Sequence, residues 1–148
     1  MNLIIFGPPG AGKGTQADFI KNKYDLYQLS TGEVLRNEII NKTSLGREIS
    51  SIINSGTLVS DDIVKKLVEN FISDKRYKNR LIFDGYPRNL IQAETLNDLL
   101  IKNGQKIDIV LKLSVSLKTI KKRILERRTL EKRADDSEEI AIKRYKTY

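Results

Sequence analysis

The chain has 148 residues, of which 39% are hydrophobic, and this size suits one domain with a modest core. It carries a net charge of +8 and contains no Cys and no His, which excludes disulfides, thiolate zinc sites, cysteine nucleophiles and imidazole bases. Any catalysis must therefore use Lys, Arg, carboxylates, hydroxyls and the backbone. No segment has the length of a membrane span or the pattern of a signal peptide, so we expect a cytoplasmic protein.

The first half of the chain begins with a strand and continues mainly as helices. An apolar run predicts a buried strand over residues 2–6, and a helix follows from about Lys13 to Asn22. A short strand is expected at 27–29. Two helices are predicted next, over 31–42 and 44–54. A third helix, which is strongly periodic, is predicted to be capped by Ser60, and the apolar face of this helix ends at Ile72.

In the second half, strands and helices alternate more regularly. The strand Leu81-Ile82-Phe83 ends at Asp84-Gly85, and the next helix closes near Asn103-Gly104. Ile107 to Leu113 predict a fourth strand. A further helix is marked by Leu117, Ile120, Ile124 and Leu125, and a last helix starts at about residue 137.

This alternation predicts an α/β fold with a parallel sheet and right-handed crossovers. Ligands of such sheets bind beyond the carboxyl ends of the strands, where Gly7, Ser30, Asp84 and Ser114 fall. We therefore expect Lys13 and Asp84 to face one crevice. The strand 107–113 would lie at an open edge, and the last helix has no glycine cap, so we expect a fold that is cut short.

A glycine-rich segment, Gly7-Pro8-Pro9-Gly10-Ala11-Gly12-Lys13-Gly14-Thr15, directly follows the first strand. Its glycines let backbone N–H groups point inward, the following helix adds its positive end, and Lys13 adds a full charge. This pattern is typical of a loop that holds a nucleoside triphosphate. Gly14 occupies the position where such loops commonly have Ser or Thr. The alternative is a tight glycine turn between a strand and a helix.

A second signal lies in residues 81–88, where an apolar strand ends in Asp84 and leads to Arg88. Many phosphate-loop enzymes reach Mg²⁺ with such an aspartate, and an arginine can bind a phosphate with two donors. The alternative is a strand-end turn with a solvated arginine. Residues 112–148 hold 12 Lys and Arg against 6 Asp and Glu. This surplus indicates either arginines that converge on polyphosphate or a solvated basic surface, for which nucleic acid would be a partner.

Five segments together resemble the adenylate kinase family. In addition to the glycine-rich segment, extended to Gln16, these are Ser30-Thr31-Gly32-Glu33, Gly56-Thr57-Leu58-Val59-Ser60-Asp61, Phe83-Asp84-Gly85-Tyr86-Pro87-Arg88 and Arg133-Ala134-Asp135-Asp136-Ser137-Glu138-Glu139. They occur in the family's order and cover the whole chain. Gly14 after the lysine is also the family's pattern, whereas Glu33 replaces its usual Asp.

The resemblance implies a fold of the P-loop NTPase type, a parallel sheet flanked by helices. The core would comprise residues 1–29, 60–126 and 137–148. A small helical excursion over 30–59 would bind the nucleoside monophosphate, and residues 127–136 would form a short lid without zinc. The family continues past Tyr148 with another strand and helix that help to form the ATP adenine pocket, so we expect these elements to be missing here.

The resemblance also implies residues for ATP and for the transfer. ATP would be bound by Gly10, Ala11, Gly12, Lys13, Gly14, Thr15, Arg123 and Arg127. The transfer itself would use Lys13, Asp84, Arg88, Arg127, Arg133 and Arg144. Asp84 would orient Mg²⁺ through its waters, with no direct protein ligand to the metal. Without the resemblance, Arg123 and Arg127, four positions apart, would be taken as one solvated helix face.

AMP would be bound by Thr31, Arg36, Thr57, Leu58, Val59, Gly85, Tyr86, Pro87, Arg88, Gln92, Arg133 and Arg144. Taken alone, Thr31 could be a helix N-cap and Gln92 a surface residue of its helix. Arg36 and Arg144 could be exposed helix charges, and Asp135 or Asp136 could cap the last helix.

The expected reaction is transfer of the γ-phosphoryl group of MgATP to AMP, which gives two ADP. ATP, AMP and ADP would be the partners of a monomer that binds neither nucleic acid nor membrane. A uridylate or cytidylate kinase shares this scaffold, although Gln92 and residues 57–59 favour AMP. A nucleotide-binding fragment without catalysis is another alternative. A basic nucleic-acid-binding domain is disfavoured because no aromatic stacking surface accompanies the arginines.

Overall fold

The computed structural model describes residues 1–131 and 137–148. Contacts between residues divide the chain into two compact units. The first unit contains residues 1–6, 13–34 and 60–112. The second contains residues 7–12, 35–59 and 113–148. The expected boundaries of excursion and lid, 30–59 and 127–136, remain predictions.

The first unit is built on a parallel sheet, as the sequence predicts. In the described residues it has four strands, in the order β2-β3-β1-β4. Their bounds are β1 Leu3–Phe6, β2 Tyr27–Ser30, β3 Leu81–Asp84 and β4 Ile109–Lys112. β1 is central and pairs Leu3 with Ile82 on one side and with Ile109 on the other.

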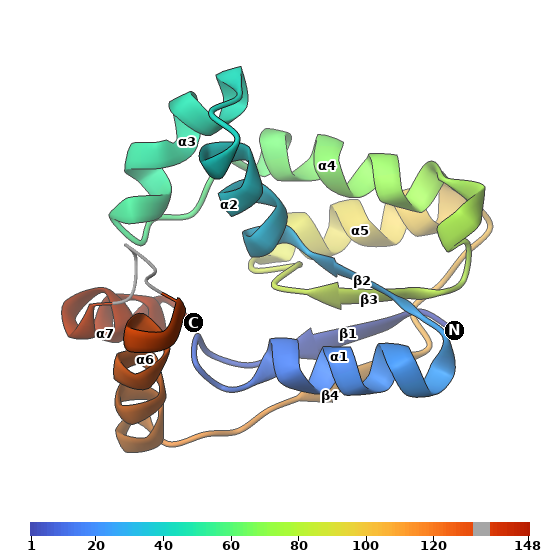
Figure 1. The fold of residues 1–148 in the computed structure, drawn as a ribbon. Helices are drawn as coiled ribbons and strands as arrows, with labels where there is room; N and C mark the ends of the chain where they lie inside the picture. Colours follow the sequence, from blue (N-terminus) through green and yellow to red (C-terminus); the bar gives the residue numbers. More distant parts are fainter. Residues whose placement is uncertain (132–136) are drawn as a thin grey trace. The chain divides into compact units, whose positions relative to one another are not determined.

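Helices cover both faces of this sheet (Figure 1). α1 (Lys13–Tyr24) lies on one face, and α4 (Asp61–Ser73) and α5 (Leu90–Lys102) lie side by side on the other. A short 3-10 helix, η1 (Lys75–Tyr77), which the sequence analysis did not predict, follows α4. Strand and helix side chains form a fully buried core between these layers, including Leu3, Ile5, Ala17, Leu29, Val68, Leu81, Ile82, Phe83 and Leu100.

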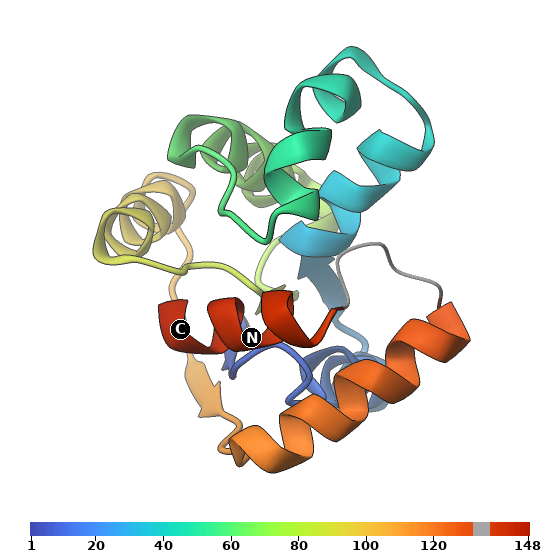
Figure 2. The same cartoon turned by 90° about the vertical axis from the view of Figure 1, so that its left-hand side faces the viewer.

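The second unit contains mainly helices. α2 (Thr31–Ile40) starts in the first unit and continues into the second, which also contains α3 (Ser44–Asn54), α6 (Leu117–Glu131) and α7 (Glu138–Thr147). α6 and α7 pack together through Ile120, Ile124 and Ala141 (Figure 2). Gly46 lets α3 approach the end of α2, because a Cβ there would lie 2.0 Å from the carbonyl oxygen of Glu38.

Most predicted elements are confirmed, and the differences have local causes. The fourth strand is shorter than 107–113, and α1 continues beyond Asn22 to Tyr24. Ser60 occupies the N-cap position of α4, but its side chain makes no capping hydrogen bond, so that part of the prediction is wrong. The acidic first turn of α4, which contains Asp61 and Asp62, interacts favourably with the helix dipole instead.

The N-cap of α7 is Ser137, whose Oγ accepts a hydrogen bond from the backbone N–H of Ile140 at 3.1 Å. The alternative caps, Asp135 and Asp136, lie outside the described residues. None of the helices in the described part of the chain is both long and apolar enough to cross a membrane.

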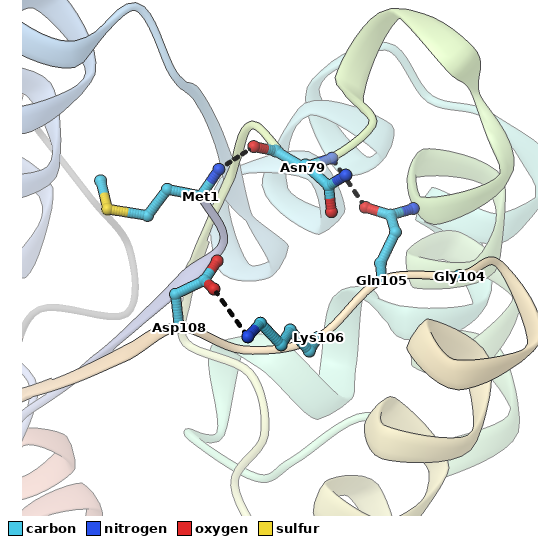
Figure 3. A pocket seen from close by; sticks show the side chains of 6 residues that line it. All are labelled: Met1, Asn79, Gly104, Gln105, Lys106 and Asp108. Atoms are coloured by element: carbon cyan, nitrogen blue, oxygen red, sulfur yellow. Dashed lines mark hydrogen bonds and ion pairs between the residues drawn. The ribbon is translucent and has the colours of Figure 1, made fainter.

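A hollow lies where β1 begins, lined by Met1, Asn79, Gly104, Gln105, Lys106 and Asp108 (Figure 3). The side chain of Asn2 ties together the segments around it: its Oδ1 accepts from the backbone of Leu81 at 3.0 Å, and its Nδ2 donates to Gln105 at 3.2 Å. Gln105 in turn accepts from the backbone N–H of Asn79 at 2.8 Å. These hydrogen bonds hold the amino ends of the strands together, at the end of the sheet that ligands of parallel sheets do not use.

Candidate active site

The carboxyl end of β3 carries Asp84, which is only 7% exposed. Its Oδ2 accepts a hydrogen bond from Nε2 of Gln28, on the neighbouring strand β2, at 3.0 Å. On its other side β3 pairs with β1, with Asp84 level with Ile5. Lys13, at the start of α1, belongs to the same unit. Asp84 therefore lies at the edge of the sheet where β1 ends, as the sequence analysis expected.

In the second unit, residues 7–12 of the glycine-rich segment pack against α6. Gly10 has a φ of +79°, which side-chain-bearing residues rarely adopt, and a Cβ there would lie 3.1 Å from Ile124. The guanidinium of Arg123, on α6, donates to the carbonyl oxygen of Ala11 at 3.1 Å. Arg123 is exposed but attached to the loop by this hydrogen bond, and its contact with ATP stays a prediction.

The turn that follows Asp84 is held by hydrogen bonds to one of its carbonyl oxygens. The carbonyl of Gly85 accepts from Oγ1 of Thr31 at 3.0 Å and from Nε of Arg88 at 2.7 Å. Thr31 is buried and is the first residue of α2, so its hydroxyl joins this helix to the turn and does not cap the helix. The turn therefore holds Arg88 beside the carboxyl end of β3.

Gln92 lies in the first turn of α5 and is 3% exposed, so its interpretation as a surface residue is wrong. Its Oε1 accepts from the backbone N–H of Arg88 at 2.7 Å. Its Nε2 donates to Oδ1 of Asp61, at the start of α4, at 2.6 Å. The N-cap of α5, Asn89, accepts from the backbone N–H of Gln92 at 2.7 Å.

Asp61 and Asn89 were not among the predicted site residues. Asp61 belongs to one of the segments that resemble the family, but nothing in its local sequence indicates a partner 31 positions away. Asn89 was recognisable as a helix cap, because Asn before an apolar helical pattern is a common N-cap. Its side chain also donates to both carboxylate oxygens of Asp61 at 3.2 Å, which no local pattern predicts.

Tyr86 is 1% exposed, and its hydroxyl has no hydrogen-bond partner among the described residues. Burial, with a smaller contribution from the negative charge of Asp61, raises the pKa of Tyr86 to about 12. The side chain is therefore a neutral part of the core. Its predicted contact with AMP, and that of Pro87, are not tested by this arrangement.

In the second unit, two cations of α7 hold the end of α3. Arg144 donates to the carbonyl oxygen of Ile53 at 3.3 Å, and Nζ of Lys143 donates to that of Ser55 at 2.9 Å. Lys143 also reaches the hydroxyl of Thr57 at 3.4 Å. The interpretation of Arg144 as a merely exposed charge is therefore wrong. Cations suit the carbonyls at a helix C-terminus.

The remaining predicted residues lie on several elements. Arg36 lies on α2 and Arg127 on α6, while Val59 is buried before α4 and Leu58 is partly exposed. Arg133 lies outside the described residues. The described part of the chain contains no group of three or more carboxylate, His or Cys side chains that could hold a metal. Mg²⁺ commonly uses one or two carboxylates together with water and substrate phosphates, so a single buried Asp84 fits such an ion.

Comparison with known proteins identifies the family. The model of the adenylate kinase family matches residues 5–148. An adenylate kinase of Pelagibacter ubique is 44% identical, with all of this chain and 82% of the relative covered. An adenylate kinase of Fusobacterium nucleatum is 42% identical, and the match covers all of this chain and 81% of the relative. An adenylate kinase of Caulobacter vibrioides is also 42% identical, and the match covers all of this chain and 78% of the relative. The chain belongs to the adenylate kinase family and is therefore a phosphotransferase of the nucleoside monophosphate kinase class.

Proposed function

We propose that this kinase transfers the γ-phosphoryl group of ATP directly to AMP and forms two ADP. The observation that carries the proposal is the position of Asp84 at the carboxyl end of β3, beside β1, whose chain continues into the glycine-rich loop and Lys13. The turn after Asp84, fixed by Thr31, supports the second half of the site, because it holds Arg88 near the same end.

In this proposal the loop from Gly10 to Thr15 wraps the ATP phosphates, and Lys13 contacts the β and γ groups. Arg123, already attached to the loop at Ala11, and Arg127 hold ATP from α6. Magnesium, held through waters by Asp84, supplies positive charge that offsets the charge of the transferring phosphoryl group when it is bound.

On the acceptor side, Arg36 and Arg88 bind the AMP phosphate, and Arg133 and Arg144 join them in the closed complex. The base is contacted by Thr31, residues 57–59 and Gln92. The attacking atom is a phosphate oxygen that is already anionic, so no general base is needed, which suits a chain without histidine. Rate enhancement then comes from in-line alignment and from cationic stabilisation of the transition state.

We further propose that residues 30–59 and 127–136 close over the substrates to exclude water, which would otherwise accept the phosphoryl group.

The enzyme would act as a monomer in the cytoplasm. Sedimentation velocity at micromolar concentration tests the oligomeric state, and a concentration-dependent dimer would contradict it.

The central test is the substitution Lys13→Met, assayed for ADP formation from ATP and AMP. We expect kcat to fall at least about a hundredfold, because a cation that contacts the transferring group is lost. Lys23→Met is the matched control, since this lysine lies exposed on the same helix. Near-normal turnover of the Lys13→Met protein would contradict the proposed role.

The acceptor is tested by comparing AMP, UMP and CMP with ATP in excess. We expect AMP to give the highest kcat/KM, and preferred use of UMP or CMP would favour the uridylate or cytidylate kinase alternative.

Isothermal titration with a bisubstrate dinucleotide separates binding from chemistry. Tight binding without turnover would identify a nucleotide-binding protein without catalysis.

A further inference from the structure

The side chain of Gln92 is held in one of its two possible amide orientations by groups on either side. A backbone N–H can only donate, so the atom that faces Arg88 must be the amide oxygen. An ionised carboxylate can only accept, so the atom that faces Asp61 must be the amide nitrogen. A flipped amide would place its oxygen against a carboxylate and its NH₂ group against an N–H donor. Both contacts would be lost and replaced by repulsion.

Asp61 is itself held in place. Asn89 donates to both of its carboxylate oxygens, and the backbone of Gln92 donates to Asn89. Asp61 starts α4 and Gln92 lies in the first turn of α5, and these helices lie side by side in Figure 1. The network therefore links two packed helices, and each of its members restricts the rotation of the others.

The two internal hydrogen bonds leave part of the amide's capacity unused. A primary amide has two N–H donors and an oxygen with two lone pairs. Arg88 uses one lone pair and Asp61 uses one donor, so the amide oxygen keeps one acceptor position and the amide nitrogen keeps one donor. Their order is fixed, because the amide orientation is fixed.

Adenine and hypoxanthine present opposite arrangements of hydrogen-bond donor and acceptor at C6 and N1. Adenine has an amino donor at C6 beside an acceptor at N1, whereas a 6-oxo purine has an acceptor at C6 beside an N–H donor at N1. A freely flipping amide could pair with either base. An amide held in one orientation pairs with one of them and leaves unsatisfied polar groups against the other, which costs affinity.

We propose that Asp61 is a positioning residue that fixes the amide of Gln92 and thereby makes the site select a 6-amino purine monophosphate over a 6-oxo purine monophosphate. The inference rests on the proposed function in one respect, namely that Gln92 contacts the base of AMP. Asp61 acts through Gln92 and touches no substrate.

The test compares AMP and IMP as acceptors for the unaltered chain, Asp61→Ala and Asp62→Ala. Asp62 is the matched control, because it contributes the same charge to the first turn of α4 but is exposed. We expect Asp61→Ala to reduce the ratio of kcat/KM for AMP to that for IMP at least about tenfold, mainly through a higher KM for AMP, with kcat little changed. Asp62→Ala should leave the ratio unchanged.

A double-mutant cycle separates this role from a general structural one. In a Gln92→Ala background, Asp61→Ala should no longer alter the ratio, because the amide through which it acts is gone. A change of the same size in both backgrounds would show that Asp61 acts on selectivity by another route and would overturn the inference.

Nuclear magnetic resonance of the Gln92 side-chain NH₂ group provides a readout that does not depend on activity or on AMP. In the unaltered chain and in Asp62→Ala we expect a shifted, exchange-protected signal. Asp61→Ala should move this signal and reduce its protection from exchange. An unshifted signal in the unaltered chain would overturn the inference. If Asp61→Ala does not fold, Asn89→Ala takes its place, because it removes the hydrogen bonds that support Asp61. The NMR signal of Gln92 and the AMP-to-IMP ratio of Asn89→Ala then test the inference.

Failure of the proposed function has a different signature. If the unaltered chain uses neither AMP nor IMP, the base contact of Gln92 is wrong and the selectivity role of Asp61 falls with it. If AMP is used well and Asp61→Ala keeps the original AMP-to-IMP ratio, the proposed function stands and only the present inference is overturned.

Discussion

β3 and β4 flank the same central strand, yet they have opposite environments. Ile82 of β3 and Ile109 of β4 both pair with Leu3 of β1. Ile82 is 0% exposed, whereas Ile109 is 41% exposed, and Val110 next to it is 57% exposed. β3 has a strand on each side, whereas β4 is one of the two edge strands of the described sheet. Two apolar strands of similar composition thus differ in burial because burial depends on neighbours and not on the strand's own residues.

The residues that we propose for the active site follow the same division. The buried strand β3 ends in Asp84 and leads into the turn that holds Arg88, while β4 ends at the exposed Lys112. A rigid, fully packed strand holds a side chain in a narrower range of positions than an exposed edge strand does. The comparison therefore predicts that substitutions along β3 affect both stability and chemistry, and that those along β4 affect neither strongly.

The largest expected effect is at the carboxyl ends of the two strands. Asp84→Asn keeps the shape of the side chain but removes its charge, so we expect kcat to fall about a hundredfold or more in steady-state assays with Mg²⁺ and ATP. Lys112→Ala, at the corresponding end of β4, should leave kcat unchanged. Equal losses of kcat in both variants would contradict the prediction that the end of β3 matters for the reaction and the end of β4 does not.

The second prediction concerns the two isoleucines opposite Leu3. Ile82→Ala should lower the free energy of unfolding by about 2–5 kcal/mol, because it leaves a cavity in a packed core. Ile109→Ala, the same chemical change at the edge, should cost less than about 1 kcal/mol. Urea unfolding followed by circular dichroism measures both. Similar losses would show that β4 is packed as tightly as β3.

Alkaline pH provides a third test, at Tyr86 after β3. Because the pKa of Tyr86 is raised to about 12 in the folded protein, its contribution to stability is fully present below its unfolded pKa, near 10. That contribution is lost as pH rises toward 12. Tyr86→Phe should abolish this part of the pH dependence and leave stability at neutral pH nearly unchanged or slightly higher, because it removes a buried hydroxyl without a partner.

The measurement is unfolding by urea at several alkaline pH values, together with the ultraviolet absorbance of phenolate. Tyr24→Phe is the control, since this tyrosine is exposed. If Tyr86 titrates together with the exposed tyrosines in the folded protein, its phenol is not buried as described.

The smallest expected effect is that of a charge on the edge strand. Val110→Lys should change the free energy of unfolding by less than about 0.5 kcal/mol but lower self-association, because a lysine on an exposed edge disfavours pairing with other strands. Light scattering against protein concentration measures this. Ile101→Lys, an exposed apolar position on α5, controls for added charge alone. Equal improvement in both variants would show that net charge, and not the edge, is responsible.

The sequence by itself determined the order and type of nearly every element, because apolar periodicity, caps and glycine turns are local. It also predicted the positions of Asp84 and Lys13 at one edge, because the carboxyl ends of parallel strands lie together. The family was evident from short motifs whose residues lie next to each other in the chain.

Only the tertiary structure decided which polar side chains hold one another. The contact of Asp61 with Gln92, that of Thr31 with Gly85 and that of Arg123 with the glycine-rich loop join residues between 31 and 112 positions apart. Such contacts depend on how helices pack across the fold, and propensity and periodicity carry no information about that packing. For this reason the sequence predicted Gln92 as a site residue but not the carboxylate that orients it.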